Sequence, residues 1–499
     1  MKFAAPALVA IWIAGLATAA SAVPTTPDCA KRVNDTPAKV AECIARDSLW
    51  RHLSHFQTIA DNNPGRGGHP NRNTGTPGYK ASVDYVAGLM HRAGYQVSIQ
   101  SYVWRHSAVV GVPTFSAAGL HYRLGTDWSV APRSGSGRVT ALVQPAGNGC
   151  EKRDFSSFVR GHIALLARDF CPMDTQVANA TARGASAIVF YDSSTPAAEP
   201  VLPRRQAVEY SMESPARVPV LLLHSNAGGA ALSQAYMQGP PAVADIDVQT
   251  RPKSDNDYNV IADSPFGDPH HIVVVDAHLD SICGAGMLDN ASGSTSILET
   301  ALALARTKTV NRLRYIWFGG EELGLLGSKY YTRHMHRNTL KRIVFDIDVD
   351  VTATPNFDVL VADPAHAHAV HRFPPNVVPQ SRVGNRDFAA YFRAAGIPSR
   401  NAWFGNDGTD SLSFSLVGVP NSGILTQQDC CKHQWEVDIW GGYLGNYEGK
   451  VPGRNGGCVD YPKRWCDNLS NNDPFVLESV SKAVAYVTLE LANDKSLGR

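Results

Sequence analysis

The sequence lacks any long hydrophobic run after its first 22 residues. Nothing there approaches the roughly 18 consecutive apolar residues of a membrane-spanning helix, so we expect no membrane segment in the mature chain. An excess of charge is also missing, because 46 Lys and Arg residues nearly balance 45 Asp and Glu residues. This balance gives no electrostatic reason to expect nucleic acid or an anionic membrane as a partner. No Cys or Cys/His cluster has the spacing of a structural zinc site.

The N-terminus has the features of a signal peptide. Lys2 supplies a positive start, residues 3–20 form an apolar run, and Ala-Ser-Ala at 20–22 fits an A-x-A cleavage site. A membrane anchor is the alternative, but the run is short for a spanning helix and rich in Ala. We therefore predict that residues 1–22 are removed and that the protein is secreted, into the medium, the periplasm or a vacuole.

All nine cysteines follow the predicted cleavage site, where export makes disulfides possible. Their spacing predicts three pairs, Cys29 with Cys43, Cys150 with Cys171, and Cys458 with Cys466. The cysteines left over are Cys283, Cys430 and Cys431. Because nine is an odd number, one thiol must remain without a partner in the chain.

The length of 499 residues favours two domains. Between about residues 106 and 250 the pattern changes. Short strands are predicted at 162–167, 187–191 and 218–223, and one helix is predicted at 174–183. This block reads as a small α/β unit of its own with few plausible catalytic clusters. It separates residues 46–105 from residues 251–499, and we predict that these two segments fold together as the catalytic domain.

From residue 258 onward, predicted strands alternate with predicted helices. The strands are expected at 272–275, 313–318, 343–351 and 422–425, and the helices at 292–305, 322–333 and 475–491. Buried strands that alternate with helices are typical of an α/β fold with a mostly parallel sheet covered on both faces. In such sheets, functional sites lie at the carboxyl ends of the strands.

A histidine and several acidic residues stand at the ends of three of these strands. In chain order they are His278 and Asp280, then Asp289, then Glu321 and Glu322, then Asp346, Asp348 and Asp350. Each alone has an ordinary explanation, such as a helix cap, a helix-dipole interaction or a solvated strand face. Gathered at one rim, however, these carboxylates would repel one another unless cations bind there.

Histidine nitrogen together with carboxylate oxygen is a zinc-type ligand set, and two such sites that share a carboxylate form a two-metal centre. We predict that His278, Asp289 and Asp350 bind one zinc ion. Asp289 would bridge to a second zinc ion, which Glu322 would also bind.

Three sequence motifs surround these residues. They are Ala-His-Leu-Asp-Ser at 277–281, Asp-Asn-Ala-Ser-Gly at 289–293 and Phe-Gly-Gly-Glu-Glu-Leu-Gly-Leu-Leu-Gly-Ser at 318–328. Together they resemble the di-zinc exopeptidase family of vacuolar aminopeptidase Y and secreted bacterial leucine aminopeptidases. Ile-Asp-Val-Asp at 347–350 is similar to the family's third metal strand, and this phasing selects Asp350 over Asp346 and Asp348. The resemblance covers nearly all of the mature chain.

The block between the two catalytic segments resembles the protease-associated domain that many members of this family carry. The matching stretches are Gly-His-Ile-Ala-Leu-Leu at 161–166, Cys171, Val-Ala-Asn-Ala at 177–180 and Gly-Ala at 184–185. The resemblance implies a zinc exopeptidase fold over residues 46–105 and 251–499, with the smaller protease-associated domain inserted at 106–250.

Two stretches depart from the family's pattern. The family's last zinc ligand is a histidine in a Cys-Tyr-His segment, but the matching stretch at 458–468 contains no histidine, and Lys463 falls at its place. His433 is the nearest upstream histidine and is the candidate substitute. The family's Arg-Ser-Asp segment appears as Gly-Thr-Asp at 408–410, so the arginine that helps hold substrate is absent. We therefore expect one tightly bound zinc ion and a second that is labile or absent.

The resemblance implies a metallo-aminopeptidase that hydrolyses N-terminal residues from peptides. Glu321 would act as the general base, Asp280 would orient the ring of His278, and Tyr461 would assist if it occupies the family's tyrosine place. A non-catalytic binding protein on the same fold is one alternative, and a glutaminyl cyclase-like acyltransferase is another. The retained ligands and base argue against the first alternative, and the missing histidine argues against the second.

Overall fold

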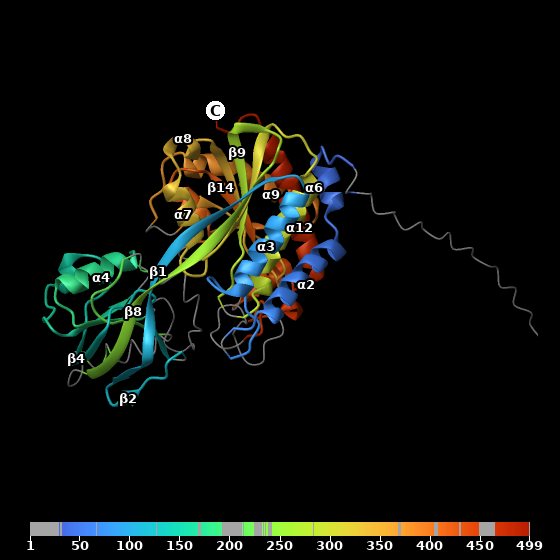
Figure 1. The fold of residues 1–499 in the computed structure, drawn as a ribbon. Helices are drawn as coiled ribbons and strands as arrows, with labels where there is room; N and C mark the ends of the chain where they lie inside the picture. The colour runs from blue at the N-terminus through green and yellow to red at the C-terminus, as the bar shows by residue number, and fades with distance from the viewer. Residues whose placement is uncertain are drawn as a thin grey trace, which may run out of the picture.

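The computed structural model describes residues 29–498, except for 30–31, 66, 126, 168–170, 192–211, 213, 224–231, 233, 235, 238–241, 283, 368–370, 404–407, 429–430 and 449–464. A larger and a smaller body are joined by a long two-stranded ribbon (Figure 1). The predicted signal peptide at 1–22 lies outside the described residues. None of the described helices combines the length and hydrophobicity needed to cross a membrane.

The larger body is built on a sheet that is parallel at its centre. The central strands run in the order β14 (Asn421–Leu425), β11 (Ile343–Val349), β9 (Asp268–His278) and β10 (Asn311–Phe318), and each neighbouring pair is parallel. The outer strands are β12 (Leu360–Ala362) and β13 (Arg400–Ala402) beyond β14, and β8 (Val243–Asp263), antiparallel to β10. Every residue of β11 and β14 is buried, as expected for strands covered on both faces.

Helices cover both faces of this sheet (Figure 1). One face packs against α2 (Arg46–Asn62), α3 (Pro77–Arg92), α6 (Ser292–Leu304), α9 (Val377–Ala394) and α12 (Pro474–Asn493), whose apolar side chains share the main core with the strands. The other face packs against α7 (Leu326–His334) and α10 (Ser411–Leu416). The larger body also contains α1 (Pro37–Cys43), α8 (Arg337–Leu340), α11 (Gln434–Trp440) and short helical turns at Met287–Ala291, Pro364–His366 and Leu469–Asn471, while a turn at Lys152–Phe155 belongs to the smaller body. The predicted α/β fold is confirmed.

The smaller body is an α/β unit with its own two cores. Its strands are β4 (Gly137–Pro145), β5 (Ile163–Ala167), β6 (Ala187–Tyr191), β7 (Val220–Leu223) and β3 (Trp128–Val130), in that order across the sheet. The first four are mutually parallel, and α4 (Met173–Ala182) packs beside them. This arrangement agrees with the small α/β unit that the sequence predicts for this block.

The ribbon that joins the two bodies consists of β8 and β1 (Gln96–Ala117), with β2 (Leu120–His121) at its far end. The two long strands pair antiparallel from Gln96 opposite Asp263 to Ala117 opposite Ala244. The sequence predicts a strand that ends near residue 104, so the outer half of β1 is missed. Residues 105–112 are all at least partly exposed, so this stretch lacks the alternation that marks a strand with one buried face.

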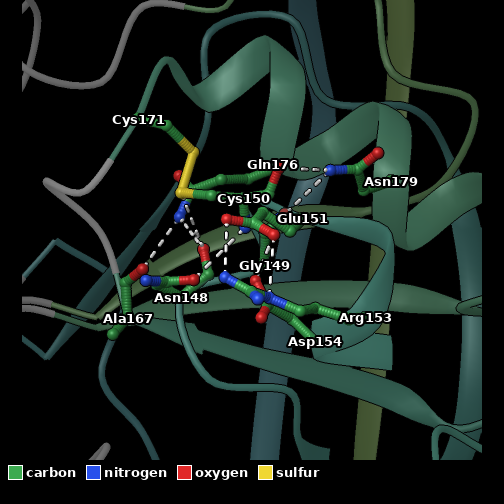
Figure 2. Close-up of a disulfide and its surroundings, with 10 residues drawn as sticks. All are labelled: Asn148, Gly149, Cys150, Glu151, Arg153, Asp154, Ala167, Cys171, Gln176 and Asn179. Carbon is green, nitrogen blue, oxygen red and sulfur yellow. Dashed lines mark hydrogen bonds and ion pairs between the residues drawn. A yellow bond between two sulfur atoms is a disulfide. The ribbon is translucent and has the colours of Figure 1, made fainter. Parts of the chain in front are cut away.

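Two of the three predicted disulfides are formed by described residues, Cys29–Cys43 and Cys150–Cys171. In Figure 2, the second bridge lies beside α4, where Asn179 donates to the backbone oxygens of Gly149 and Cys150. Cys458, the predicted partner of Cys466, lies outside the described residues. Cys466 and Cys431 are both disulfide-bonded.

The predicted start of a helix at residue 322 is wrong, because α7 begins only at Leu326. The preceding segment turns sharply, with positive φ at Gly320 and Leu325. The backbone N–H of Gly327 donates to the oxygen of Gly319 at 2.9 Å, which closes this segment into a compact loop. Both glutamates of the motif therefore lie on a loop at the end of β10.

Candidate active site

The ends of three neighbouring strands bring together five of the six predicted metal-site and base residues, all except His433. His278 is the last residue of β9, Asp289 lies in the turn Met287–Ala291, Glu321 and Glu322 follow β10, and Asp350 follows β11. Each of the five residues is at most 4% exposed. Bulk water therefore screens the charges of this cluster very little.

Within the described part of the chain, two groups of ligand atoms form, and both contain His278. One group joins His278, Asp289 and Asp350, and the other joins His278, Glu321 and Glu322, with ligand atoms within 4.8 Å of one another. The Nε2 atom of His278 lies 2.9 Å from Asp289 Oδ1 and 3.3 Å from Asp350 Oδ1. One imidazole among four buried carboxylates favours a bound cation, and this donor set fits zinc.

The ring of His278 is held in a defined orientation. Its Nδ1 atom lies 3.2 Å from the backbone oxygen of Asp280, so Nδ1–H donates there and Nε2 faces the carboxylates. Burial lowers the pKa of His278, but the charge of Glu321 and hydrogen bonds to three aspartates outweigh burial and raise this pKa well above its ordinary value. Binding of a metal ion at Nε2 therefore displaces a proton.

Asp280 connects the histidine to the predicted base. Its carboxylate accepts hydrogen bonds from the Thr74 hydroxyl at 2.7 Å and from the backbone N–H of Glu321 at 3.2 Å. The carboxylate is slightly farther from His278 Nδ1, at 3.5 Å, than the backbone oxygen of Asp280 is. The predicted orienting role thus has two components here, one from the backbone and one from the side chain.

The loop that carries Asp289 is fixed by two side chains that sequence reasoning missed. The carboxylate of Asp467 accepts from the backbone N–H of Leu288 at 2.7 Å and of Asp289 at 3.1 Å. The Oδ1 atom of Asn290 accepts from the backbone N–H of Val351 at 3.0 Å, next to Asp350. These bonds tie the loop both to the C-terminal segment and to the end of β11.

Arg72 is a second feature that the sequence did not reveal. Its side chain is fully buried and donates to the backbone oxygens of Leu279, Ala285 and Gly286, each at 2.7 Å. Burial lowers the pKa of Arg72 to about 10, so the guanidinium remains charged at neutral pH. Arg72 thereby holds the segment between His278 and Asp289, although nothing in its own glycine-rich surroundings marks it as part of a site.

Comparison with known proteins decides the family. Residues 259–488 match Peptidase family M28, and residues 138–232 match the PA domain. The chain is 31% identical to a protein named "Aminopeptidase" of Pseudomonas aeruginosa strain PAO1, over 91% of this chain and 82% of that protein. The chain belongs to peptidase family M28. The family predicted from the motifs is confirmed, and so is the insertion of a protease-associated domain.

Solved structures support the fold of this M28 peptidase. An aminopeptidase from Aneurinibacillus sp. strain AM-1 superposes with a TM-score of 0.68 at 20% identity, covering 93% of this chain and 97% of that one. A zinc aminopeptidase from Bacillus subtilis gives 0.59 at 21% identity, covering 91% and 96%. The PA match lies inside the predicted insertion, while the boundaries at 46–105, 106–250 and 251–499 stay predictions.

Beneath the ligand groups, the M28 peptidase carries a layer of four more carboxyl groups that are 0% exposed. They belong to Asp276, Asp346, Asp348 and Asp410. Burial and mutual repulsion raise the pKa of Asp348 to about 7 and those of the other three well above the ordinary value. Asp346 and Asp348, which the sequence also placed on the acidic strand, belong to neither ligand group.

We predict that Asp346→Asn stabilises the protein at pH 7 by about 1–3 kcal/mol. Neither carboxylate oxygen of Asp346 has a hydrogen-bond partner among the described residues. The pKa of Asp346 is higher in the folded protein than in the unfolded chain. Above about pH 4 the unfolded chain therefore releases this proton more readily than the folded protein does, and the stability falls as the pH rises. Thermal unfolding at pH 4 and pH 7 measures this, and the gain should shrink toward pH 4.

Asp263→Asn is the matched control for this prediction. Asp263 accepts two hydrogen bonds from Arg314, at 2.6 and 2.7 Å, so its neutralisation should destabilise the protein. An Asp346→Asn variant that unfolds at a lower temperature than the parent at pH 7 would contradict the prediction.

The structure places His433 outside both ligand groups. Its side chain is exposed and accepts a hydrogen bond from the backbone at the start of α11. The carboxylate of Glu436 accepts a hydrogen bond from the backbone N–H of His433 at 2.6 Å, which completes a capping box. Lys463 and Tyr461 lie outside the described residues.

We predict that His433→Ala leaves zinc content and turnover within about twofold of the parent, because the variant loses only a helix cap. Such a loss costs about 0.5–2 kcal/mol of stability. Metal analysis together with steady-state kinetics checks this. Loss of one zinc ion per chain in the variant would show instead that His433 is the substitute ligand.

Proposed function

We propose that this M28 peptidase is a secreted zinc aminopeptidase that removes N-terminal residues from peptides. The main support is the pair of buried ligand groups that share His278. The group with Asp289 and Asp350 offers three protein ligands, which is the usual number for a catalytic zinc ion that keeps a position for water. The group with Glu321 and Glu322 offers a further ligand and a carboxylate for proton transfer.

A zinc ion held by these residues would act as a Lewis acid, lowering the pKa of a water molecule and polarising the scissile carbonyl. Glu321 accepts the proton of the attacking water and returns it to the leaving amine. Asp280 fixes the backbone of Glu321 and the ring of His278 at the same time. Tyr461 as a donor to the developing oxyanion remains a prediction.

We further propose that zinc is held tightly by His278, Asp289 and Asp350, and weakly at the position served by Glu322. Asp289 is the better bridge because a carboxylate has two oxygens, while one imidazole nitrogen serves a single ion. A bridge and one further carboxylate are fewer ligands than catalytic zinc usually has. Purified protein should then contain about one zinc ion per chain, and added zinc should raise the activity.

An amino-acid chromogenic amide and its N-acetylated analogue test the activity. We expect hydrolysis of the free-amine substrate only, its loss after chelation and its recovery with zinc. Equal cleavage of the acetylated substrate would contradict aminopeptidase specificity. Zinc-bound protein without turnover on a panel of such amides would favour the non-catalytic alternative, and cyclisation of N-terminal glutamine would favour the cyclase alternative.

The proposal that the chain is exported rests on the predicted signal peptide and on the Cys29–Cys43 and Cys150–Cys171 disulfides, which persist in oxidising compartments. The expected mature N-terminus is Val23, because cleavage follows Ala22. N-terminal sequencing of protein recovered from the medium or from a non-cytoplasmic fraction checks this. Full-length chains confined to the cytoplasm would contradict it.

A further inference from the structure

The ribbon that leads to the inserted domain also forms hydrogen bonds with the loop that carries Glu321. In Figure 1, β1 and β8 pass from the smaller body along the edge of the catalytic sheet. Next to β10, Asn259 of β8 contacts both ends of the 319–327 loop. Its Oδ1 atom accepts from the backbone N–H of Gly319 at 3.1 Å, and its Nδ2 atom donates to the oxygen of Gly327 at 3.0 Å.

The fit between Asn259 and this loop is close. A Cβ atom on Gly327 would lie 2.3 Å from Asn259 Oδ1, and one on Gly319 would lie 2.7 Å from the backbone oxygen of Tyr258. Only glycine therefore fits at either end of the loop. The ribbon thus sets the path of the backbone on both sides of the two glutamates.

Tyr102 of β1 makes a third contact with the same loop. Its hydroxyl oxygen lies 2.7 Å from the backbone oxygen of Gly319 and 2.9 Å from Asp257 Oδ2. A phenol has one hydrogen to donate, and a backbone oxygen can only accept. The Tyr102 hydroxyl can therefore donate to the backbone oxygen of Gly319 and at the same time accept a hydrogen bond from Asp257, provided that the Asp257 carboxyl group is protonated. In that arrangement, hydrogen bonds run from Asp257 to Tyr102 and from Tyr102 to the loop.

The surroundings of Asp257 favour this direction. Asp257 is 0% exposed, and burial together with the charge of Asp280 raises its pKa to about 8. The carboxyl group is therefore mostly protonated at neutral pH and can donate. Gly319 is two residues before Glu321, whose own N–H is fixed by Asp280, so the base is held from the ribbon on one side and from the metal site on the other.

We propose that Tyr102 and Asn259 are positioning residues that hold Glu321 in place for proton transfer. They act from the ribbon that also carries the protease-associated domain. The inference rests on the proposed aminopeptidase function. Because a displacement of about 1 Å can cost as much as 100-fold in rate, loss of one such contact should affect kcat more than binding.

The test compares Tyr102→Phe with Tyr95→Phe in the full chain. Both hydroxyls are buried and donate to a backbone oxygen at 2.7 Å, but Tyr95 bonds to Ala301 of α6, away from the loop. We expect Tyr102→Phe to lower kcat about tenfold with KM and zinc content nearly unchanged, and Tyr95→Phe to leave kcat unchanged. Asn259→Leu, which removes both loop contacts, should act like Tyr102→Phe and serves as the second variant if one fails to fold.

Introducing Tyr102→Phe into the Glu321→Gln variant tests whether Tyr102 acts by positioning Glu321 or by stabilising the fold in general. If Tyr102 acts through the base, Tyr102→Phe should lower the residual turnover of Glu321→Gln by less than twofold. The same tenfold loss in both backgrounds, or an effect carried by KM or zinc content, would overturn the proposal. A parent enzyme without turnover would instead refute the proposed function, so the two failures are distinguishable.

Discussion

Glu321→Gln is expected to lose nearly all turnover while it keeps the fold and the bound zinc. Glutamine has nearly the same shape as glutamate but cannot accept the proton of the attacking water, and a removed general base typically costs about 10²–10⁴ in rate. The backbone N–H of Glu321 still bonds to Asp280 in the variant, so the loop should stay in place. Steady-state kinetics with a chromogenic amide, together with metal analysis, measures both properties.

Glu299→Gln is the matched control for this variant. Glu299 is also buried, but it lies on α6 and bonds to Ser48 at 2.7 Å, apart from both ligand groups. We expect this control to keep the parent's kcat even if it unfolds at a lower temperature. Near-normal turnover of Glu321→Gln would show that another residue serves as the base.

Asp289→Ala is expected to reduce zinc content more than any other single carboxylate change. If Asp289 bridges the two positions, its loss weakens both at once, because each ion loses a charged ligand. Its Oδ1 atom lies 2.9 Å from His278 Nε2, closer than Asp350 Oδ1 at 3.3 Å and Glu321 Oε2 at 4.0 Å. Zinc per chain after dialysis, read against activity, measures the effect.

Asp350→Ala and Glu322→Ala provide the comparison, since under the proposal each removes a ligand of only one ion, whereas Asp289 would serve both. Asp289 itself lies in the ligand group with Asp350, and the residue common to both groups is His278. Asp350→Ala should release the tight zinc ion, while Glu322→Ala should abolish only the activation by added zinc. If Asp289→Ala retains one tightly bound zinc ion, Asp289 is a terminal ligand and the assignment of the bridge is wrong.

The departures from the family's pattern remain the most informative positions for these experiments. The sequence predicts that the second zinc position lacks its histidine, and the described residues bring no second histidine into either ligand group. The low number of ligands is the physical reason to expect a labile second ion. Zinc titration of the parent and of His433→Ala therefore tests the same expectation from two directions.

Local sequence patterns predicted much of the catalytic sheet. Residues 272–275 form a continuous apolar run before His278, β10 ends in an apolar run, and β11 carries acidic residues at alternate positions. These patterns predicted three strands, and the carboxyl ends of parallel strands were expected at one rim. The start of α7 was missed because the turn before it depends on backbone contacts with Gly319 and on positive φ angles. Helix propensity at Glu322 gives no hint of either.

By itself, the sequence determined the family, the α/β class, the inserted domain and which His and acidic residues could meet at the strand ends. These features are encoded in short motifs and in periodicity along the chain. Only the tertiary structure decided that Arg72 and Asp467 hold the Asp289 loop and that Tyr102 and Asn259 grip the Glu321 loop. Each of these contacts joins residues at least 60 positions apart, and a side chain's partner at that distance depends on how the sheet and ribbon pack rather than on its neighbours in sequence.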